Sequence, residues 1–252
     1  MKQKLYGVDF KHLEVNGYRN INQIYLQKNR LHACETLFGD WNAKLMILAQ
    51  DAANFKTIEL LLKANPNKNP FRHGENVDTN QNLFNLLDEF HFFKLGKINK
   101  PNNKNCGIYY ANAVWLLKIS DSMSGRLVDK KKAFLTSQQV FKATLDNLDN
   151  LKLIITLGHE PFLFLKTIFN KEIIGNWHDT VIKRKLNYFK YKDKNLIVGS
   201  IYHTSKRGII GRAKKNNYTG KGSFEKGYQL CLEDLKEIIN KSRILTSSLD
   251  KS

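Results

Sequence analysis

The sequence has no run of apolar residues close to the roughly 18–20 that a membrane-spanning helix needs. Its first twenty residues begin with a positive charge but hold no apolar stretch of the kind found in secretory signal peptides. Only three cysteines occur (Cys34, Cys106 and Cys231), and no two form a CxxC pair. A disulfide framework or zinc site is therefore not expected, and an iron–sulfur cluster usually needs a fourth thiol. We expect a cytoplasmic protein, nucleoid-associated if bacterial, with no membrane attachment, metal or cofactor.

Acidic residues are scarce beside basic ones: 23 Asp and Glu against 41 Lys and Arg give a net charge of +18. An excess of this size favours a polyanionic partner, either nucleic acid or an anionic membrane surface. The chain is also rich in Lys and Asn, and an AT-rich genome is a second explanation for part of the charge. With 252 residues, 42% of them hydrophobic, the chain suits one domain. We expect a monomer with a single domain over residues 1–244 and a flexible tail at 245–252.

Short apolar runs alternate with segments of helical spacing. The runs lack the polar alternation of half-exposed strands, which is typical of a parallel sheet covered on both faces. This pattern predicts an α/β protein, a three-layer α/β/α sandwich around a central four-stranded parallel sheet. The predicted strands are Leu45–Ala49, Ile108–Val114, Leu153–Leu157 and Leu196–Ile201. The predicted helices are Ile21–Phe38, Gln81–Phe90, Lys132–Leu148, Pro161–Phe169 and Glu225–Ile239.

Polar residues gather where these predicted strands end. Gln50 and Asp51 follow the first strand, Asn112 lies near the end of the second, and His203 follows the fourth. Ligands of open parallel sheets bind beyond the carboxyl ends of the strands. A carboxylate, an amide and an imidazole are therefore expected at one edge of one sheet, where they form a candidate site.

Four segments resemble motifs of family 1 of the uracil-DNA glycosylase superfamily. AQDAAN at 49–54 resembles the water-activating motif GQDPYH, and GIYYANAVWLL at 107–117 resembles the strand LLLNTVLTV that presents the uracil-reading asparagine. HTS at 203–205 looks like the HPS motif, and RGIIG at 207–211 is similar to the RGFFG that follows it. The four occur in the order that the family has them.

Two further segments resemble the iron–sulfur-containing families of the same superfamily. NPFRHG at 69–74 resembles their PFVGRAG segment, and IITLGHEPF at 154–162 looks like their LGKEA turn. The resemblance covers about two thirds of the chain, from about residue 44 to 212. It implies the uracil-DNA glycosylase fold and the excision of uracil or a related base from DNA, without a cofactor.

The resemblance also implies roles for individual residues. Asp51 would orient the attacking water and face the positively charged sugar, and His203 would donate a hydrogen bond to the departing base. Four residues would contact the base: Gln50 through the backbone N–H after it, Asn112 by reading its edge, Phe71 by stacking, and Ala53 beside C5. Three residues after the fourth strand would contact DNA: Ser205, Lys206 and Arg207.

Three departures from the family motifs bear on the expected specificity. Ala52-Ala53 replaces the Pro-Tyr pair whose Tyr excludes thymine, which implies a roomier pocket. Thr204 replaces the proline of HPS. The leucine that fills the vacated base stack is missing, which leaves Arg207, Ile209 or Ile210 as the candidate wedge.

Ordinary structural roles remain alternatives for the same residues. Asp51 is placed to cap the following helix, Asn112 to make a structural hydrogen bond, and His203 to lie in a satisfied loop. Phe71 follows a proline and is typical of a core aromatic. Two other functions also stay open: a DNA-binding protein that has lost the chemistry, and an RNA- or nucleotide-directed hydrolase.

Overall fold

The central sheet has the strand order β3-β2-β5-β7-β6. The computed structural model describes residues 15–20, 39–51, 54–66, 77–90, 106–119, 127–170 and 172–244. The strands are β2 (Leu45–Asp51), β3 (Ile108–Val114), β5 (Leu153–Leu157), β6 (Asn187–Tyr191) and β7 (Lys194–Ile201). The four predicted strands are confirmed as β2, β3, β5 and β7, and neighbours among them pair in parallel.

The prediction of a four-stranded, wholly parallel sheet is wrong, because β6 adds a fifth strand antiparallel to β7. Lys192 and Asp193 form the two-residue turn between them, and Lys192 has the positive φ of 55° that such hairpin turns require. Strand β6 alternates buried and exposed side chains, with Phe189 buried and Tyr188 64% exposed. This outer strand is not among the strands that the sequence predicts.

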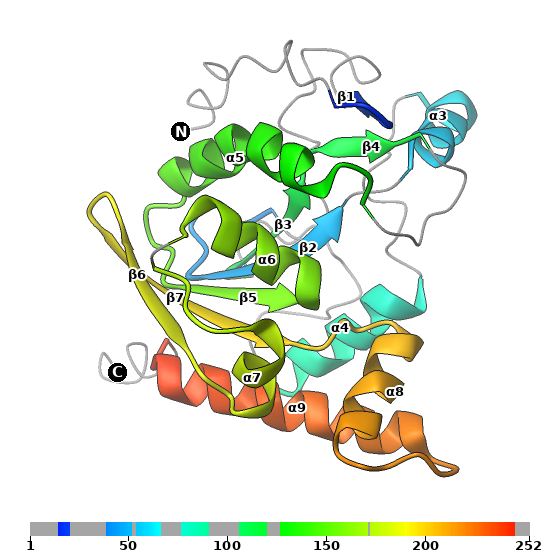
Figure 1. Ribbon diagram of the computed structural model, residues 1–252, viewed down its shortest axis with the longest axis vertical. Coiled ribbons are helices and arrows are strands. Elements are labelled where there is room, and N and C mark those ends of the chain that lie inside the picture. Colours follow the sequence, from blue (N-terminus) through cyan, green and yellow to red (C-terminus); the bar gives the residue numbers. More distant parts are fainter. Residues whose placement is uncertain are drawn as a thin grey trace.

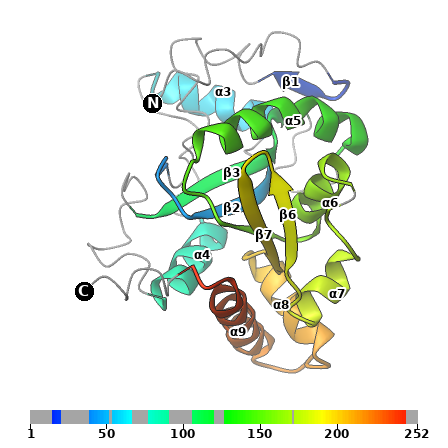
Figure 2. The ribbon, with the colours of Figure 1, turned by 90° about the vertical axis from the view of Figure 1, so that its left-hand side faces the viewer.

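Helices flank both faces of the mixed sheet, an arrangement compatible with three α/β/α layers (Figures 1 and 2). Alternate side chains of β2 show the two faces: Met46 and Leu48 belong to one buried cluster, and Leu45 and Ile47 belong to the other. The first cluster includes side chains of α5 (Lys130–Asn147) and α6 (His159–Ile168). The second includes those of α4 (Asp78–Asp88), α8 (Lys206–Lys215) and α9 (Ser223–Ser242).

The predicted helices at residues 81–90, 132–148, 161–169 and 225–239 correspond to α4, α5, α6 and α9, whose starts and ends differ by up to three residues. Three helices were not predicted: α3 (Phe55–Ala64), α7 (Trp177–Ile182) and α8. The predicted helix at 21–38 and the predicted tail at 245–252 lie outside the described residues.

A second, two-stranded sheet lies beside the end of β3. Strand β4 (Leu116–Lys118) follows β3 after Trp115 and pairs antiparallel with β1 (Tyr18–Asn20). An isolated bridge also joins Lys118 to Asn54, three residues after β2 ends. Through this extension the chain brings the side chain of Lys118 to the carboxyl end of β2.

Candidate functional site

The structure places the candidate site at the carboxyl edge of the parallel strands. Gln50 and Asp51 are the last two residues of β2. The sequence predicted that they follow this strand, so β2 is two residues longer than predicted. Asn112 lies in β3 and pairs with Ala49 of β2. His203 follows β7 by two residues. Two other predicted residues, Ala53 and Phe71, lie outside the described residues.

The Asp51 carboxylate is held by two donors on the same oxygen. Its Oδ2 accepts a hydrogen bond of 2.8 Å from Gln50 Nε2 and lies 3.1 Å from Lys118 Nζ. The Lys118 side chain is 3% exposed and that of Asp51 is 10% exposed, so the ion pair is almost wholly buried. The helix that follows is capped by Asn54, whose side chain accepts from the Thr57 N–H. The capping alternative for Asp51 is therefore wrong.

His203 lies in a loop whose backbone holds the imidazole ring by a hydrogen bond to one ring nitrogen. The backbone N–H of Ser205 donates to His203 Nδ1 over 3.2 Å. In the neutral ring, an accepting Nδ1 leaves the proton on Nε2. Burial lowers the pKa of His203 below its ordinary value of 6.5, and the charge of Asp51 opposes this shift. At pH 7 the ring is therefore neutral and carries an Nε2–H donor.

We predict that NMR of ¹⁵N-labelled protein will find His203 as the Nε2–H tautomer, with a titration midpoint below 6.5. Because the unfolded chain binds this proton more tightly, the free energy of unfolding also falls as the pH drops below 6.5. The spectrum of a His203→Asn variant assigns the resonance. A midpoint above 6.5, or the Nδ1–H tautomer, contradicts this geometry.

The loop at residues 202–205 is anchored from two helices. The Asn82 side chain of α4 donates to the Thr204 carbonyl over 2.9 Å, and Ser205 caps α8 by accepting from the Gly208 N–H. Gly208 also packs directly against the loop, since a Cβ there would overlap the carbonyl oxygen of His203. Ser205, predicted to contact DNA, is thus also the residue that starts α8 and orients His203.

Asn112 carries a buried acceptor without a hydrogen-bond partner. The residue is 8% exposed, and its Oδ1 accepts no hydrogen bond from the part of the chain that the structure describes. An unsatisfied buried acceptor costs about 1–3 kcal/mol, so its presence needs an explanation. The sequence left a structural hydrogen bond as the alternative role of Asn112, and Asn112 Oδ1 makes none with the described residues. A base edge with an N–H donor is a partner that fits it.

A small cavity, with room for about one water molecule, adjoins Asn112 between β3 and α5. It lies away from the His203 loop, and mostly apolar or aromatic side chains line it. We therefore place the candidate site at the sheet edge, where the titratable groups lie, and not in this cavity. Its lining residues are Tyr109, Ala111, Asn112, Trp115, Ser137, Val140, Phe141 and Thr144.

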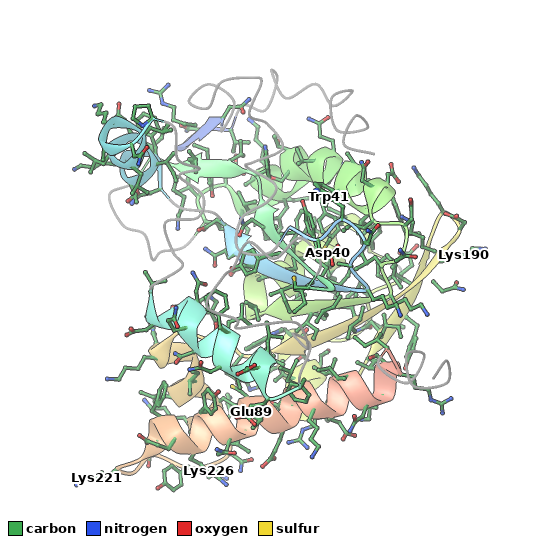
Figure 3. All side chains as sticks on the ribbon, turned by 180° about the vertical axis from the view of Figure 1, so that it is seen from behind. Asp40, Trp41, Glu89, Lys190, Lys221 and Lys226 are labelled. Atoms are coloured by element: carbon green, nitrogen blue, oxygen red, sulfur yellow. The ribbon has the colours of Figure 1, made fainter. Side chains whose placement is uncertain are left out.

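Exposed basic residues occur at both ends of α8. Lys206 and Arg207, two of the predicted DNA contacts, are exposed in its first turn, and Lys214 and Lys215 are exposed in its last. Lys221 and Lys226 are also exposed, and Figure 3 shows them where the chain enters α9. Of the three candidate wedges, Ile209 is excluded because it is fully buried, whereas Arg207 is exposed and Ile210 is partly exposed.

Comparisons with models of known protein families and with curated proteins found no significant match to this chain. Within the described ranges, no group of three or more His, Cys, Asp or Glu side chains is placed to hold a metal ion. The helices of those ranges also include none with the length and apolar character to cross a membrane. Evidence for function therefore comes from the chemistry of the sheet edge and from the sequence motifs.

Proposed function

We propose that the protein is a DNA glycosylase that flips uracil, or a related deaminated or modified base, out of DNA and hydrolyses its N-glycosidic bond. The observation that carries this proposal is the sheet edge itself. It combines a buried carboxylate at Asp51, a neutral imidazole with an Nε2–H donor at His203, and an unpartnered amide oxygen at Asn112. The resemblance to the uracil-DNA glycosylase superfamily assigns chemistry to the same three residues.

Cleavage of the N-glycosidic bond separates charge in a way that suits these groups. Positive charge develops on the sugar and negative charge on the leaving base. A carboxylate such as Asp51 stabilises the sugar cation and orients the water that attacks it. The Nε2–H of His203 donates to the base oxygen that becomes anionic, and such a donor is typically worth about 10²–10³ in rate.

The amide of Asn112 supplies a basis for choosing the base. Its Oδ1 is an acceptor for an N–H, and its Nδ2 is a donor for a carbonyl oxygen. Uracil offers that complementary pair at N3–H and O4. Cytosine offers the reverse, an acceptor at N3 and a donor at the neighbouring amino group. Asn112 therefore favours uracil-like edges over cytosine.

A panel of end-labelled duplexes tests the function. Each duplex carries a single uracil, hypoxanthine, xanthine or G·T mismatch, and one half of each sample is treated with alkali to cut at abasic sites. The proposal expects alkali-dependent cleavage at one or more lesions and an unmodified duplex that stays intact. Cutting without alkali, or cutting of RNA, supports a different hydrolase, whereas binding without cleavage at any lesion supports a DNA-binding protein.

Gly208→Ala is expected to slow excision about 10²-fold, because the added Cβ displaces the carbonyl of His203 and moves its ring. Gly211→Ala on the same helix is the matched control, since its Cβ would lie 3.7 Å from the Tyr202 ring, an ordinary contact. We expect the control to excise at the wild-type rate and to be about 1 kcal/mol more stable. Single-turnover rates measure both, and equal rates in the two variants would refute the packing role of Gly208.

DNA affinity is expected to fall linearly with salt on logarithmic axes, with a slope of about 0.9 for each phosphate neutralised. Lys206→Ala combined with Arg207→Ala should make that slope shallower by about 1.8 if both bind phosphate. Lys190→Ala is the control, because Lys190 is exposed on β6, away from the α8–α9 corner (Figure 3). Fluorescence anisotropy titrations at several salt concentrations measure the slopes. A salt-independent affinity would mean that the +18 charge is only compositional.

A further inference from the structure

Lys118 is a buried cation directed at the proposed catalytic carboxylate. Its side chain is 3% exposed, and its Nζ lies 3.1 Å from Asp51 Oδ2. Burying an ammonium group is costly unless an anion pairs with it. The position is created by β4, which leaves the end of β3 and pairs with β1 rather than with the central sheet. No family motif in the sequence pointed to this lysine.

The two carboxylate oxygens of Asp51 have different surroundings. Lys118 and Gln50 both approach Oδ2, and no donor among the described residues reaches Oδ1. Oδ1 is thus the oxygen left for a water or a sugar.

We propose that Lys118 is a positioning residue of this site: together with Gln50 it holds Asp51 by Oδ2 as an ionised carboxylate, so that Oδ1 faces the attacking water and the sugar. The proposal rests on the proposed glycosylase function. It assigns to Lys118 no contact with DNA, since a side chain 3% exposed is not available to phosphates.

Three other described titratable groups feel the charge of Asp51, and none of them is positive at pH 7. Burial and the charge of Asp51 raise the pKa of Tyr18 on β1 to about 12 and also raise the pKa of Tyr110 on β3. Burial lowers the pKa of His203, which the charge of Asp51 raises to a smaller extent. At pH 7 these three side chains are neutral. Lys118 is then the described residue that balances the negative charge of Asp51.

Lys118→Met tests the proposal, because methionine keeps the apolar stem and removes the charge. We expect single-turnover excision at pH 7 to slow about 10²-fold, as for a misplaced catalytic group, with the Kd for DNA within twofold of wild type. The loss should fall on the rate of the chemical step and not on DNA affinity, because Lys118 is buried beside Asp51. A purely structural role would lower the thermal midpoint and leave excision by the folded variant at the wild-type rate.

Lys194→Met is the matched control. Lys194 is 13% exposed and its Nζ donates to the carbonyls of Leu145 and Leu148 at the end of α5. This variant also loses a largely buried ammonium group, so its thermal midpoint should fall. We expect its excision rate to match that of the wild type.

Two further variants decide the question if Lys118→Met does not fold. Lys118→Arg keeps the charge and should retain most of the rate, whereas Gln50→Met removes the other donor to Oδ2 and should lower the rate at unchanged DNA affinity. If Lys118→Met folds, wild-type rates in both Gln50→Met and Lys118→Met overturn the positioning role. If Lys118→Met does not fold, a wild-type rate in Gln50→Met alone overturns it. Either result leaves the proposed function standing. A wild-type chain that excises no base overturns both.

Discussion

Asp51→Asn is expected to slow base excision at least about 10²-fold, because the amide cannot carry the charge that faces the sugar cation or accept a proton from the water. DNA affinity should persist or rise, since a negative charge near the phosphates is removed. Single-turnover excision of the best substrate from the duplex panel measures the rate, and anisotropy measures the affinity. Full activity in this variant would remove Asp51 from the mechanism.

The buried partner of Asp51 determines the control for that experiment. Asp51→Asn removes the carboxylate that pairs with Lys118 and puts an amide oxygen in its place, and breaking a buried pair outright costs about 3–5 kcal/mol. Some loss of stability is therefore expected from this variant alone. Asp51→Asn combined with Lys118→Met removes both charges and should recover part of the thermal midpoint. Slow excision by the more stable double variant shows that the lost rate is chemical and not a consequence of unfolding.

Asp234→Ala is expected to lower the free energy of unfolding by about 3–5 kcal/mol. Asp234 is fully buried on α9 and accepts from two arginines. Arg212 of α8 donates from Nε over 2.6 Å and from Nη2 over 3.0 Å, and Arg184 donates from Nε over 2.8 Å. The substitution leaves Arg212, which is 3% exposed, as a buried cation without its anion. Urea denaturation followed by circular dichroism measures the loss.

Glu233→Ala is the control for Asp234→Ala. Glu233 is the next residue along α9 and accepts from Arg184 Nη2 over 3.0 Å, but its side chain is 54% exposed. An exposed pair is worth about 0–1 kcal/mol, so we expect a loss within that range. A loss below about 1 kcal/mol for Asp234→Ala as well would contradict the view that the buried Arg212–Asp234 pair joins α8 to α9. This pair bears on the proposed function, because α8 carries Lys206 and Arg207 and begins at the His203 loop.

The four parallel strands were predictable because each is a continuous apolar run in a doubly covered sheet. Strand β6 was not, because its mixture of polar and aromatic residues between flanking lysines is typical of an edge strand and equally of a solvated loop. Helix α8 was also missed. Two glycines within its ten residues, Gly208 and Gly211, weaken the helix signal, and the cap at Ser205 and packing on α9 stabilise the helix.

The sheet-edge site was predictable in outline because strand ends meet at one edge whatever lies between them in sequence. Asp51 ends β2, His203 follows β7 by two residues, and Asn112 lies in β3 two residues before that strand ends. Lys118 was not predictable, since a lysine that ends an apolar run normally extends to solvent. Only the pairing of β4 with β1, a long-range contact, turns this lysine inward. The burial of Arg212 against Asp234 likewise depends on how α8 packs against α9.

Detection of the released base is the measurement that decides whether this sheet edge is a glycosylase site. Uracil-containing duplex is incubated with excess protein, and free base is quantified by mass spectrometry for the wild type and for Asp51→Asn combined with Lys118→Met. The proposed mechanism predicts one free base for each lesion from the wild type, with the strand intact until alkali is added, and release at least about 10²-fold slower from the double variant. A wild-type protein that binds the duplex but releases no uracil, or a double variant that releases it as fast, would contradict that mechanism.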